Sequence, residues 1–160
     1  MAMKEQKTNA MRILEQKKIP YTATEYPHGD APVDGVTVAQ LTGKDPDTVY
    51  KTLVAVGASR QHYVFVIPVA RTLDLKKAAS AVKEKSVAMI HVSEITPLTG
   101  YVRGGCSPVG MKKKYPTYID ETAELYDTIA VSAGKRGMQM LLSPEDLRAY
   151  CEAEFADIAQ

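Results

Sequence analysis

The sequence predicts a single α/β (α+β) domain in which peripheral helices surround a mixed β-sheet. The chain has 160 residues, a length at which one domain buries a core without disulfide bonds or a metal. Helix-like and strand-like segments alternate along it, which is typical of a mixed sheet with helices around it. No linker-like, low-complexity or repeated segment divides the chain. Residues 1–160 are therefore expected to form one unit.

The N-terminal third is predicted to alternate between helix and strand. Apolar residues at helical spacing predict a helix over 4–18, which Pro20 stops. Residues 21–26 alternate and are rich in β-forming side chains, so they predict a strand that ends in a turn over 27–30. A short helix over 37–41 and a turn over 44–47 are expected to follow.

The centre of the chain is predicted to be a β-hairpin. The apolar runs 51–56 and 62–68 are separated by the turn-like residues 57–61, a spacing that suits two antiparallel strands. We expect this pair to form the centre of the sheet. An amphipathic helix is predicted over 74–82 and a further strand over 86–92.

The C-terminal region contains a β-rich run over 128–131 and a well-specified helix start. Ser143 is a typical N-cap residue, Pro144 suits the first helical position, and Glu145 and Asp146 place negative charge where the helix dipole favours it. The sequence therefore predicts a final helix from 144 to about 155.

Composition excludes several classes of protein. Lys and Arg number 20 against 19 Asp and Glu, so nucleic-acid binding would have to come from local clusters of charge. Cys106 and Cys151 make neither a disulfide framework nor a Cys-x-x-Cys motif, which favours a reducing cytosol. The N-terminus is polar, and no apolar run reaches the ~18 residues of a membrane span. A soluble, cytoplasmic protein is expected.

The most informative segment is residues 100–110, with the sequence GYVRGGCSPVG, which follows a β-like run. Gly104 and Gly105 permit positive φ and close approach of a ligand, so successive amides here could bind an anion or a developing oxyanion. A tight turn between strands would use the same residues. The turn over 132–137 and the segment around Lys51 add glycine, Lys and Arg beside two further β-like runs. Together they suggest one site for an anionic ligand.

These motifs in this order resemble the YbaK/EbsC aminoacyl-tRNA deacylases. The resemblance rests on VYKTL over 49–53, LDLKK over 73–77, TGYVRGGCSPVG over 99–110, residues 116–120 and VSAGKRG over 131–137, and it covers nearly the whole chain. It implies a barrel-like central sheet and a free-standing editing enzyme related to the editing insertion of bacterial prolyl-tRNA synthetases. The implied substrate is a cysteinyl ester on tRNA for proline, with the substrate's own thiol attacking the ester and releasing a thiolactone.

The resemblance also implies roles for particular residues. Lys51 would hold the 3′-end of the tRNA, and the amides of Gly104 and Gly105 would surround the reacting ester. The implied substrate-binding residues are Tyr26, Thr52, Tyr101, Ser107, Pro108, Ser132, Gly134, Lys135, Arg136 and Gln139. Three consecutive lysines are expected to contact acceptor-stem phosphates, although such a run is commonly only a solvated face: Lys112, Lys113 and Lys114.

The chain departs from the family pattern at two positions. Cys106 stands where the pattern has an aliphatic residue, and Gln139 stands where it has an aspartate. A cysteine in this loop could be a nucleophile, but His28, His62 and His91 show no spacing that identifies a base, and a small buried thiol is the favoured interpretation. The histidines also form no metal motif, so neither metal nor organic cofactor is expected.

Other functions stay open from the sequence. The chain could deacylate another mischarged tRNA such as Ala-tRNA(Pro), or it could be a hydrolase that uses Cys106. It could also be a non-catalytic module that binds tRNA ends or a synthetase. Prolyl-tRNA synthetase is a possible partner, because so small a domain has little surface with which to read a tRNA body.

Overall fold

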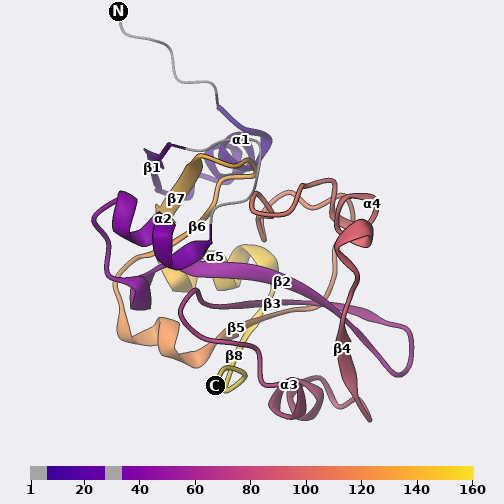
Figure 1. Cartoon of the computed structure of the whole chain (residues 1–160). Helices are drawn as coiled ribbons and strands as arrows, with labels where there is room; N and C mark the ends of the chain where they lie inside the picture. The colour runs from indigo at the N-terminus through magenta and orange to yellow at the C-terminus, as the bar shows by residue number, and fades with distance from the viewer. Residues whose placement is uncertain (1–6, 28–33) are drawn as a thin grey trace, which may run out of the picture.

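The structure is a computed structural model, which describes residues 7–27 and 34–160 (Figure 1). Its first half contains, in order, α1 (Asn9–Gln16), β1 (Thr22–Glu25), α2 (Gly35–Leu41), a 3₁₀ turn (Pro46–Thr48), β2 (Tyr50–Gly57), β3 (His62–Pro68), α3 (Leu75–Val82) and β4 (Val87–Met89). Residues 4–6 of the expected first helix and residues 28–30 of the expected turn lie outside the described residues.

The second half begins with two short helical segments, a 3₁₀ turn (Val92–Glu94) and α4 (Ile95–Thr99). It continues with β5 (Thr117–Asp120), a 3₁₀ turn (Glu121–Leu125), β6 (Ile129–Ser132), β7 (Met138–Leu142), α5 (Pro144–Cys151) and β8 (Glu154–Ala156). Four of the helices start at a residue whose side chain accepts a hydrogen bond from the first turn, as N-caps do: Thr8, Asp34, Asp74 and Ser143.

The strands form two sheets. One is antiparallel with the order β1-β7-β6, and the other is mixed with the order β4-β2-β3-β5-β8. The expected hairpin is confirmed, because β2 and β3 pair antiparallel from Tyr50 opposite Pro68 to Val56 opposite His62. A parallel bridge between Val49 and Ala130 joins the two sheets. The expected mixed sheet with a barrel-like form is therefore built from two sheets that meet at the start of β2.

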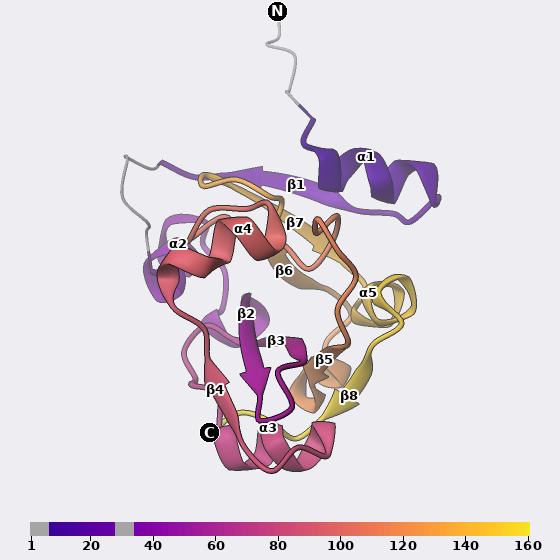
Figure 2. The ribbon, with the colours of Figure 1, turned by 90° about the vertical axis from the view of Figure 1, so that its right-hand side faces the viewer.

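The main core lies between the two sheets and is closed by α1 and α5. Its buried residues include Leu14 of α1, Val66 of β3, Met140 of β7 and Leu147 of α5. A second cluster lies on the other face of the five-stranded sheet, where Phe65 and Ile67 pack under Ala78 of α3. Figure 2 shows this layering, with β1, β6 and β7 at the top, β2 and β3 in the middle and α3 at the bottom.

Two sequence predictions are wrong in ways that affect the site. The expected helix over 144–155 ends at Cys151, since Glu152 adopts φ 53° and residues 154–156 form β8 beside β5. The expected strand over 86–92 is limited to β4, and the chain then turns into α4. Gly100, at φ 84°, caps that helix. The glycine-rich loop therefore follows a helix and not a strand.

Candidate active site

A cavity of about 630 Å³ opens between the first part of β2, α2 and the glycine-rich loop. β4 pairs with residues 55–57 of β2 and not with the earlier part of that strand. Residues 50–54, in the earlier part, line the cavity. Six of the sequence-predicted residues line it: Tyr26, Lys51, Thr52, Gly104, Ser132 and Gln139. The fold therefore brings together residues that are up to 113 positions apart between Tyr26 and Gln139.

Strand register places three of these residues in one row. Residues two apart in a strand share a face, and directly paired residues do so across strands. Val49 is bridged to Ala130 of β6, so Lys51 and Ser132, each two residues further along their strands, lie on the same face. Gln139 of β7 pairs directly with Ser132. The cavity wall therefore carries the row Lys51, Ser132, Gln139, which we call the polar row.

Lys51 is a half-buried cation. Burial lowers the pKa of its ammonium group below the usual lysine value, because water no longer solvates the charge fully. Among residues 7–27 and 34–160, no carboxylate lies within ion-pair distance of it. A phosphate or a polarised carbonyl entering the cavity would supply the missing countercharge and raise this pKa again. Lys51 thus suits the binding of an anionic or electron-rich group.

Two buried polar atoms in the cavity wall have no hydrogen-bond partner, Thr52 Oγ1 and Gln139 Oε1. Gln139 is only 5% exposed, so bulk water does not satisfy its amide. A buried polar atom without a partner costs about 1–3 kcal/mol, and native proteins commonly retain such atoms where a ligand binds. The cavity is therefore polar at its buried end as well as at Lys51.

The two adjacent glycines have different roles. Gly104 adopts φ 85° and lines the cavity, which agrees with the prediction of close backbone approach. Gly105 does not line the cavity, and its N–H already donates to the Val102 carbonyl at 2.9 Å. A Cβ at Gly105 would lie 3.0 Å from the backbone of Lys135 and Arg136. Gly105 thus packs against the neighbouring turn in the free protein, and its expected role beside a reacting ester stays a prediction.

The turn over 133–137 supports this loop from behind. Arg136 Nε donates to the Arg103 carbonyl at 2.8 Å, and the Ser132 hydroxyl accepts from Gly134 N at 3.1 Å. Gly134 packs so closely on Tyr101 that a Cβ would lie 2.9 Å from the ring. Of this segment Ser132 lines the cavity, and Gly134, Lys135 and Arg136 are not among its lining residues. Gly134 and Arg136 contact the glycine loop, and the expected contact of all three with substrate stays a prediction.

Three other predicted substrate-binding residues brace the same loop. Tyr101 OH donates to the Val109 carbonyl at 2.5 Å, and burial raises the pKa of this phenol to about 12. Ser107 is fully buried, and its hydroxyl accepts from Val109 N at 3.2 Å. The Pro108 carbonyl accepts a hydrogen bond from Cys151 Sγ at 3.6 Å. None of the three lines the main cavity, because the loop folds back on itself after Cys106.

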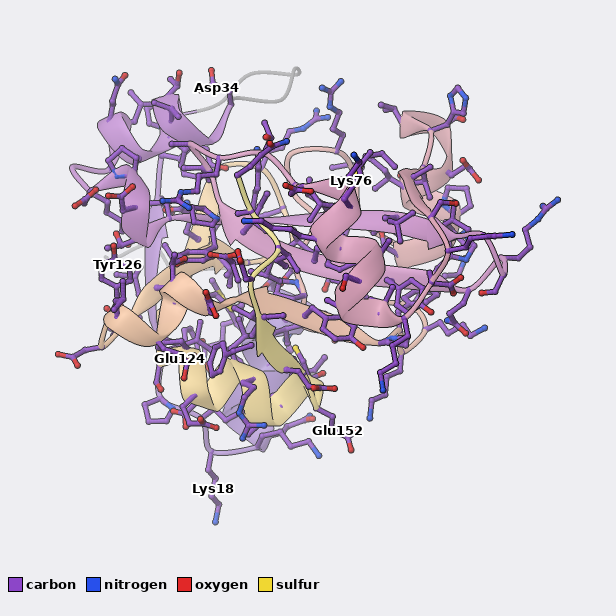
Figure 3. All side chains as sticks on the ribbon, turned by 90° about the horizontal axis from the view of Figure 1, so that it is seen from below. Lys18, Asp34, Lys76, Glu124, Tyr126 and Glu152 are labelled. Carbon is purple, nitrogen blue, oxygen red and sulfur yellow. The ribbon has the colours of Figure 1, made fainter. Side chains whose placement is uncertain are left out.

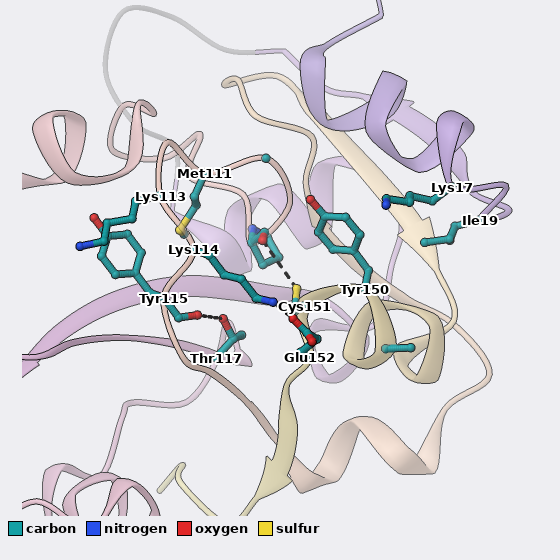
Figure 4. Close-up of a pocket in the computed structure, with 13 residues that line it drawn as sticks. Lys17, Ile19, Met111, Lys113, Lys114, Tyr115, Thr117, Tyr150, Cys151 and Glu152 are labelled. Atoms are coloured by element: carbon teal, nitrogen blue, oxygen red, sulfur yellow. Dashed lines mark hydrogen bonds and ion pairs between the residues drawn. The ribbon is translucent and has the colours of Figure 1, made fainter.

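Two lysines of the run line a second cavity of about 560 Å³, to which the later part of the glycine-rich loop contributes (Figure 4). Lys113 and Lys114 line it together with Lys17 and Tyr150, and Lys114 pairs with Glu152. Lys113 Nζ also lies 5.9 Å from the centre of the Tyr115 ring. Lys112 reaches the Pro97 carbonyl at 3.4 Å and lines neither cavity. We call Lys17, Lys113 and Lys114 the basic groove.

Cys106 lines the main cavity as a protonated thiol. Burial raises its pKa to about 11, and the Thr99 hydroxyl lowers it only in part. No described histidine lines the cavity: His62 lies edge-on to Tyr115, His91 caps the 3₁₀ turn before α4, and His28 is outside the described residues. The two described histidines are therefore not placed to act as a base for Cys106.

Sequence reasoning missed several residues of the cavity. Arg103 lines it beside the predicted Gly104, and Asp34, which caps α2, lies at its edge. An apolar wall is added by three side chains from separate elements, Val36, Leu53 and Met89. Arg103 could have been predicted as a site residue from its position next to the two glycines. No local sequence pattern predicts the apolar wall, because its side chains come together only in the folded chain.

The described part of the chain contains no group of three His, Cys, Asp or Glu side chains that could hold a metal ion. Its helices are all too short or too polar to cross a membrane. The groups that line the main cavity are therefore two cations, Lys51 and Arg103, the Asp34 carboxylate, neutral polar groups, backbone amides and a protonated thiol.

The comparisons with known proteins agree with this geometry. A family model described as the aminoacyl-tRNA editing domain matches residues 32–150. A protein of Enterococcus faecalis, EbsC, described as a candidate Cys-tRNA(Pro)/Cys-tRNA(Cys) deacylase, is 47% identical over 154 residues, which are 96% of this chain and 94% of that protein.

Solved structures show the same fold. A candidate trans-editing enzyme for prolyl-tRNA synthetase superposes with a TM-score of 0.82 at 26% identity, covering 98% of this chain and 99% of the other. A hypothetical protein superposes with a TM-score of 0.83 at 21% identity, covering 93% and 97%. With a family model that spans most of the chain and a relative at 47% identity over almost all of it, this protein belongs to the aminoacyl-tRNA editing domain family.

Proposed function

We propose that this protein is a free-standing editing enzyme that removes cysteine from mischarged Cys-tRNA(Pro). The observation that carries the proposal is the main cavity, where an unpaired, half-buried Lys51 stands in the polar row beside Gly104. This arrangement suits an aminoacyl ester at a tRNA 3′-end, which has phosphate and carbonyl oxygens for Lys51. The 47% identity to EbsC, itself described as a candidate deacylase of Cys-tRNA(Pro) and Cys-tRNA(Cys), supports the same substrate.

The proposed reaction uses the nucleophile of the substrate. The cysteinyl thiol loses its proton, its sulfur attacks the ester carbonyl carbon, and the bond from that carbon to the ribose oxygen breaks. The ribose oxygen takes up a proton, and the thiolactone that forms is opened by water. An internal nucleophile held close to its target can act as if present at about 10⁵ M or more. The protein therefore has to position the ester and stabilise charge on its oxygen.

The cavity offers the groups for those two tasks. Lys51 would hold the terminal phosphate or the carbonyl oxygen, and the backbone at Gly104, which has no Cβ, would let the ester approach the loop closely. The apolar wall of Val36, Leu53 and Met89 would accept the short side chain of the amino acid. An alanyl ester would also fit this wall. Since it has no thiol, we expect it to be cleaved slowly.

Hydrolysis through Cys106 is the less favoured reaction. With a thiol pKa of about 11, about one molecule in 10⁴ carries the thiolate at pH 7. The cavity also lacks a described histidine that could act as its base. Cys106 is better explained as a small side chain that fits under the loop.

The body of the tRNA would be bound elsewhere. The basic groove of Lys17, Lys113 and Lys114 shares the glycine-rich loop with the main cavity, since Gly104 and Cys106 line the one and Pro108 and Gly110 the other, so an acceptor stem leaving the main cavity could pass there. Phosphate contacts of this kind supply affinity without sequence specificity. We therefore propose that selection of tRNA for proline comes from a partner, and prolyl-tRNA synthetase is the candidate.

The first experiment compares cleavage of Cys-tRNA(Pro) by the unchanged protein, Lys51→Ala and Cys106→Ala, with Ala-tRNA(Pro) as a parallel substrate. We expect kcat/KM to fall by at least 100-fold in Lys51→Ala, because Lys51 is the lysine of the polar row that would hold the ester, and to stay within about threefold in Cys106→Ala. Thiolactone should be detected as the first product by mass spectrometry.

Each alternative has its own signature in this assay. Loss of activity in Cys106→Ala would favour the cysteine hydrolase, and efficient cleavage of Ala-tRNA(Pro) would favour an alanine-editing enzyme. If the unchanged protein binds tRNA but cleaves neither ester, the non-catalytic module takes the place of the deacylase.

A further inference from the structure

We propose that the buried amide of Gln139 recognises the free α-ammonium group of the aminoacyl substrate. This proposal rests on the proposed function and adds a specificity-determining residue to it. Gln139 would distinguish an aminoacyl group from an acyl group that has no amine. It would do so through its side-chain carbonyl oxygen, Oε1.

Without substrate, the side-chain amide of Gln139 is incompletely hydrogen-bonded. Gln139 is 5% exposed, it lines the main cavity, and Oε1 has no hydrogen-bond partner among the described residues. Its backbone is held by strand pairing on both sides, with Thr24 of β1 and Ser132 of β6. A buried acceptor on such a rigid strand is a fixed recognition group that needs a donor from the ligand.

Only some groups of the substrate can donate a hydrogen bond to Oε1. The ester carbonyl, the ester oxygen and the phosphates only accept hydrogen bonds, so they suit Lys51 and not Oε1. The α-ammonium group donates up to three hydrogen bonds and carries a positive charge, and hydrogen bonds to a charged group are the stronger kind. Among the donors of an aminoacyl ester, it gains most from a buried carbonyl oxygen.

Gln139 and Lys51 come from strands that do not pair with each other. Gln139 is on β7, and β6 with Ser132 lies between β7 and the start of β2. A positively charged ammonium group is repelled by Lys51 and is placed best at the far end of the row.

The test measures equilibrium binding, so that it does not depend on turnover. Two non-cleavable tRNA(Pro) analogues, with an amide in place of the ester, would carry either a cysteinyl or a 3-mercaptopropionyl group, which differ only in the α-amine. The proteins are the unchanged chain, Gln139→Met, Gln139→Glu and the matched control Gln61→Met. Gln61 lies in the β2–β3 turn and donates to the His62 carbonyl, remote from the cavity lining.

We expect the unchanged protein and Gln61→Met to bind the cysteinyl analogue on the order of 10-fold to 100-fold more tightly than the deaminated one, as for one hydrogen bond to a charged group. Gln139→Met should abolish this preference while leaving affinity for the deaminated analogue within about twofold. Gln139→Glu, which can only accept, should keep it. The preference should also fall as pH rises through the α-amine pKa, about 8.

Three results would overturn the inference. The unchanged protein could bind both analogues equally, Gln139→Met could weaken both equally, or Gln139→Glu could lose the preference, which would identify the amide as a donor to another group. A terminal 2′-deoxyadenosine in both analogues tests the ribose hydroxyl as the competing donor. If removing it abolishes the effect of Gln139→Met, the hydroxyl is the ligand. Failure to cleave Cys-tRNA(Pro) would overturn the proposed function alone.

Discussion

Thr52 shows at the scale of one residue how the cavity exchanges stability for binding. Its hydroxyl is buried in the wall without a hydrogen-bond partner, although it sits in a strand between Lys51 and Leu53 that is otherwise regular. Valine has nearly the same shape and an equal preference for strands. A hydroxyl retained here therefore points to the ligand and not to the fold.

Thr52→Val is expected to raise the free energy of unfolding by about 1 kcal/mol, because it removes a buried polar atom that gains nothing in the free protein. Urea denaturation would measure the change. The matched control is Thr117→Val, since the Thr117 hydroxyl is also buried but donates to the Tyr115 carbonyl at 3.0 Å.

In that control the unfolding free energy should fall by about 1 kcal/mol. The substituted Thr52 protein should also bind the non-cleavable cysteinyl analogue less tightly. Unchanged affinity together with lower stability would show that Thr52 is structural.

At the scale of elements, the site depends on two loops that interlock. The glycine loop contacts the backbone of Lys135 and Arg136 through Gly105, and the Arg136 side chain returns a hydrogen bond to Arg103. Tyr101 fills the space above Gly134. Each loop thus fixes the position of the other, and Gly104 is held at the cavity by contacts that lie behind it.

Gly105→Ala is expected to reduce kcat/KM by at least tenfold, since its Cβ would lie 3.0 Å from backbone atoms that have to move. The unfolding free energy should fall by about 1–3 kcal/mol as in other overpacked sites. Cleavage assays and urea denaturation would measure the two effects.

Gly43→Ala is the control for this substitution. Gly43 has φ 69° and open space around its Cβ position, away from the cavity, so alanine there should cost stability through backbone strain but leave kcat/KM unchanged. Normal cleavage by Gly105→Ala would contradict the interlocked arrangement.

At the scale of the whole molecule, two cavities are lined by different parts of one loop. The polar row occurs where β2 and β6 meet, and the basic groove lies between that loop, the end of α1 and the end of α5. Figure 3 shows Lys18 and Glu152 on one side of the molecule and Lys76 of α3 well away from both. The charge next to the site is therefore local, in a chain whose net charge is only +1.

Replacing Lys17 and Lys113 together by Gln should weaken tRNA binding at low salt and reduce the slope of log Kd against log salt by about 1 for each lost phosphate contact. The charge-matched control is Lys76→Gln with Lys85→Gln, both exposed and outside the two cavities. Equal slopes for the two double variants would show that the groove does not contact the tRNA.

The sequence by itself determined those features whose signals are local. Ser143 and Pro144 start α5, turn residues separate β2 from β3, and the motifs around Lys51 and residues 100–110 identify the family. Each depends on neighbours along the chain: a cap, a turn, or a run with fixed spacing. Lys51, Gly104 and Gln139, which the sequence motifs singled out, line one cavity, and their roles are proposals.

Only the tertiary structure decided what the loops do and where the cavities lie. Gly105 and Arg136 could not be separated from ligand-binding residues by sequence, because the contacts that occupy them come from each other's loop. The end of the last helix was misplaced because β8 exists only by pairing with β5. Likewise, the missing hydrogen-bond partner of Gln139 follows from its burial between β1, β6 and the cavity. Burial and pairing are set by residues distant along the chain, and local propensity carries no information about them.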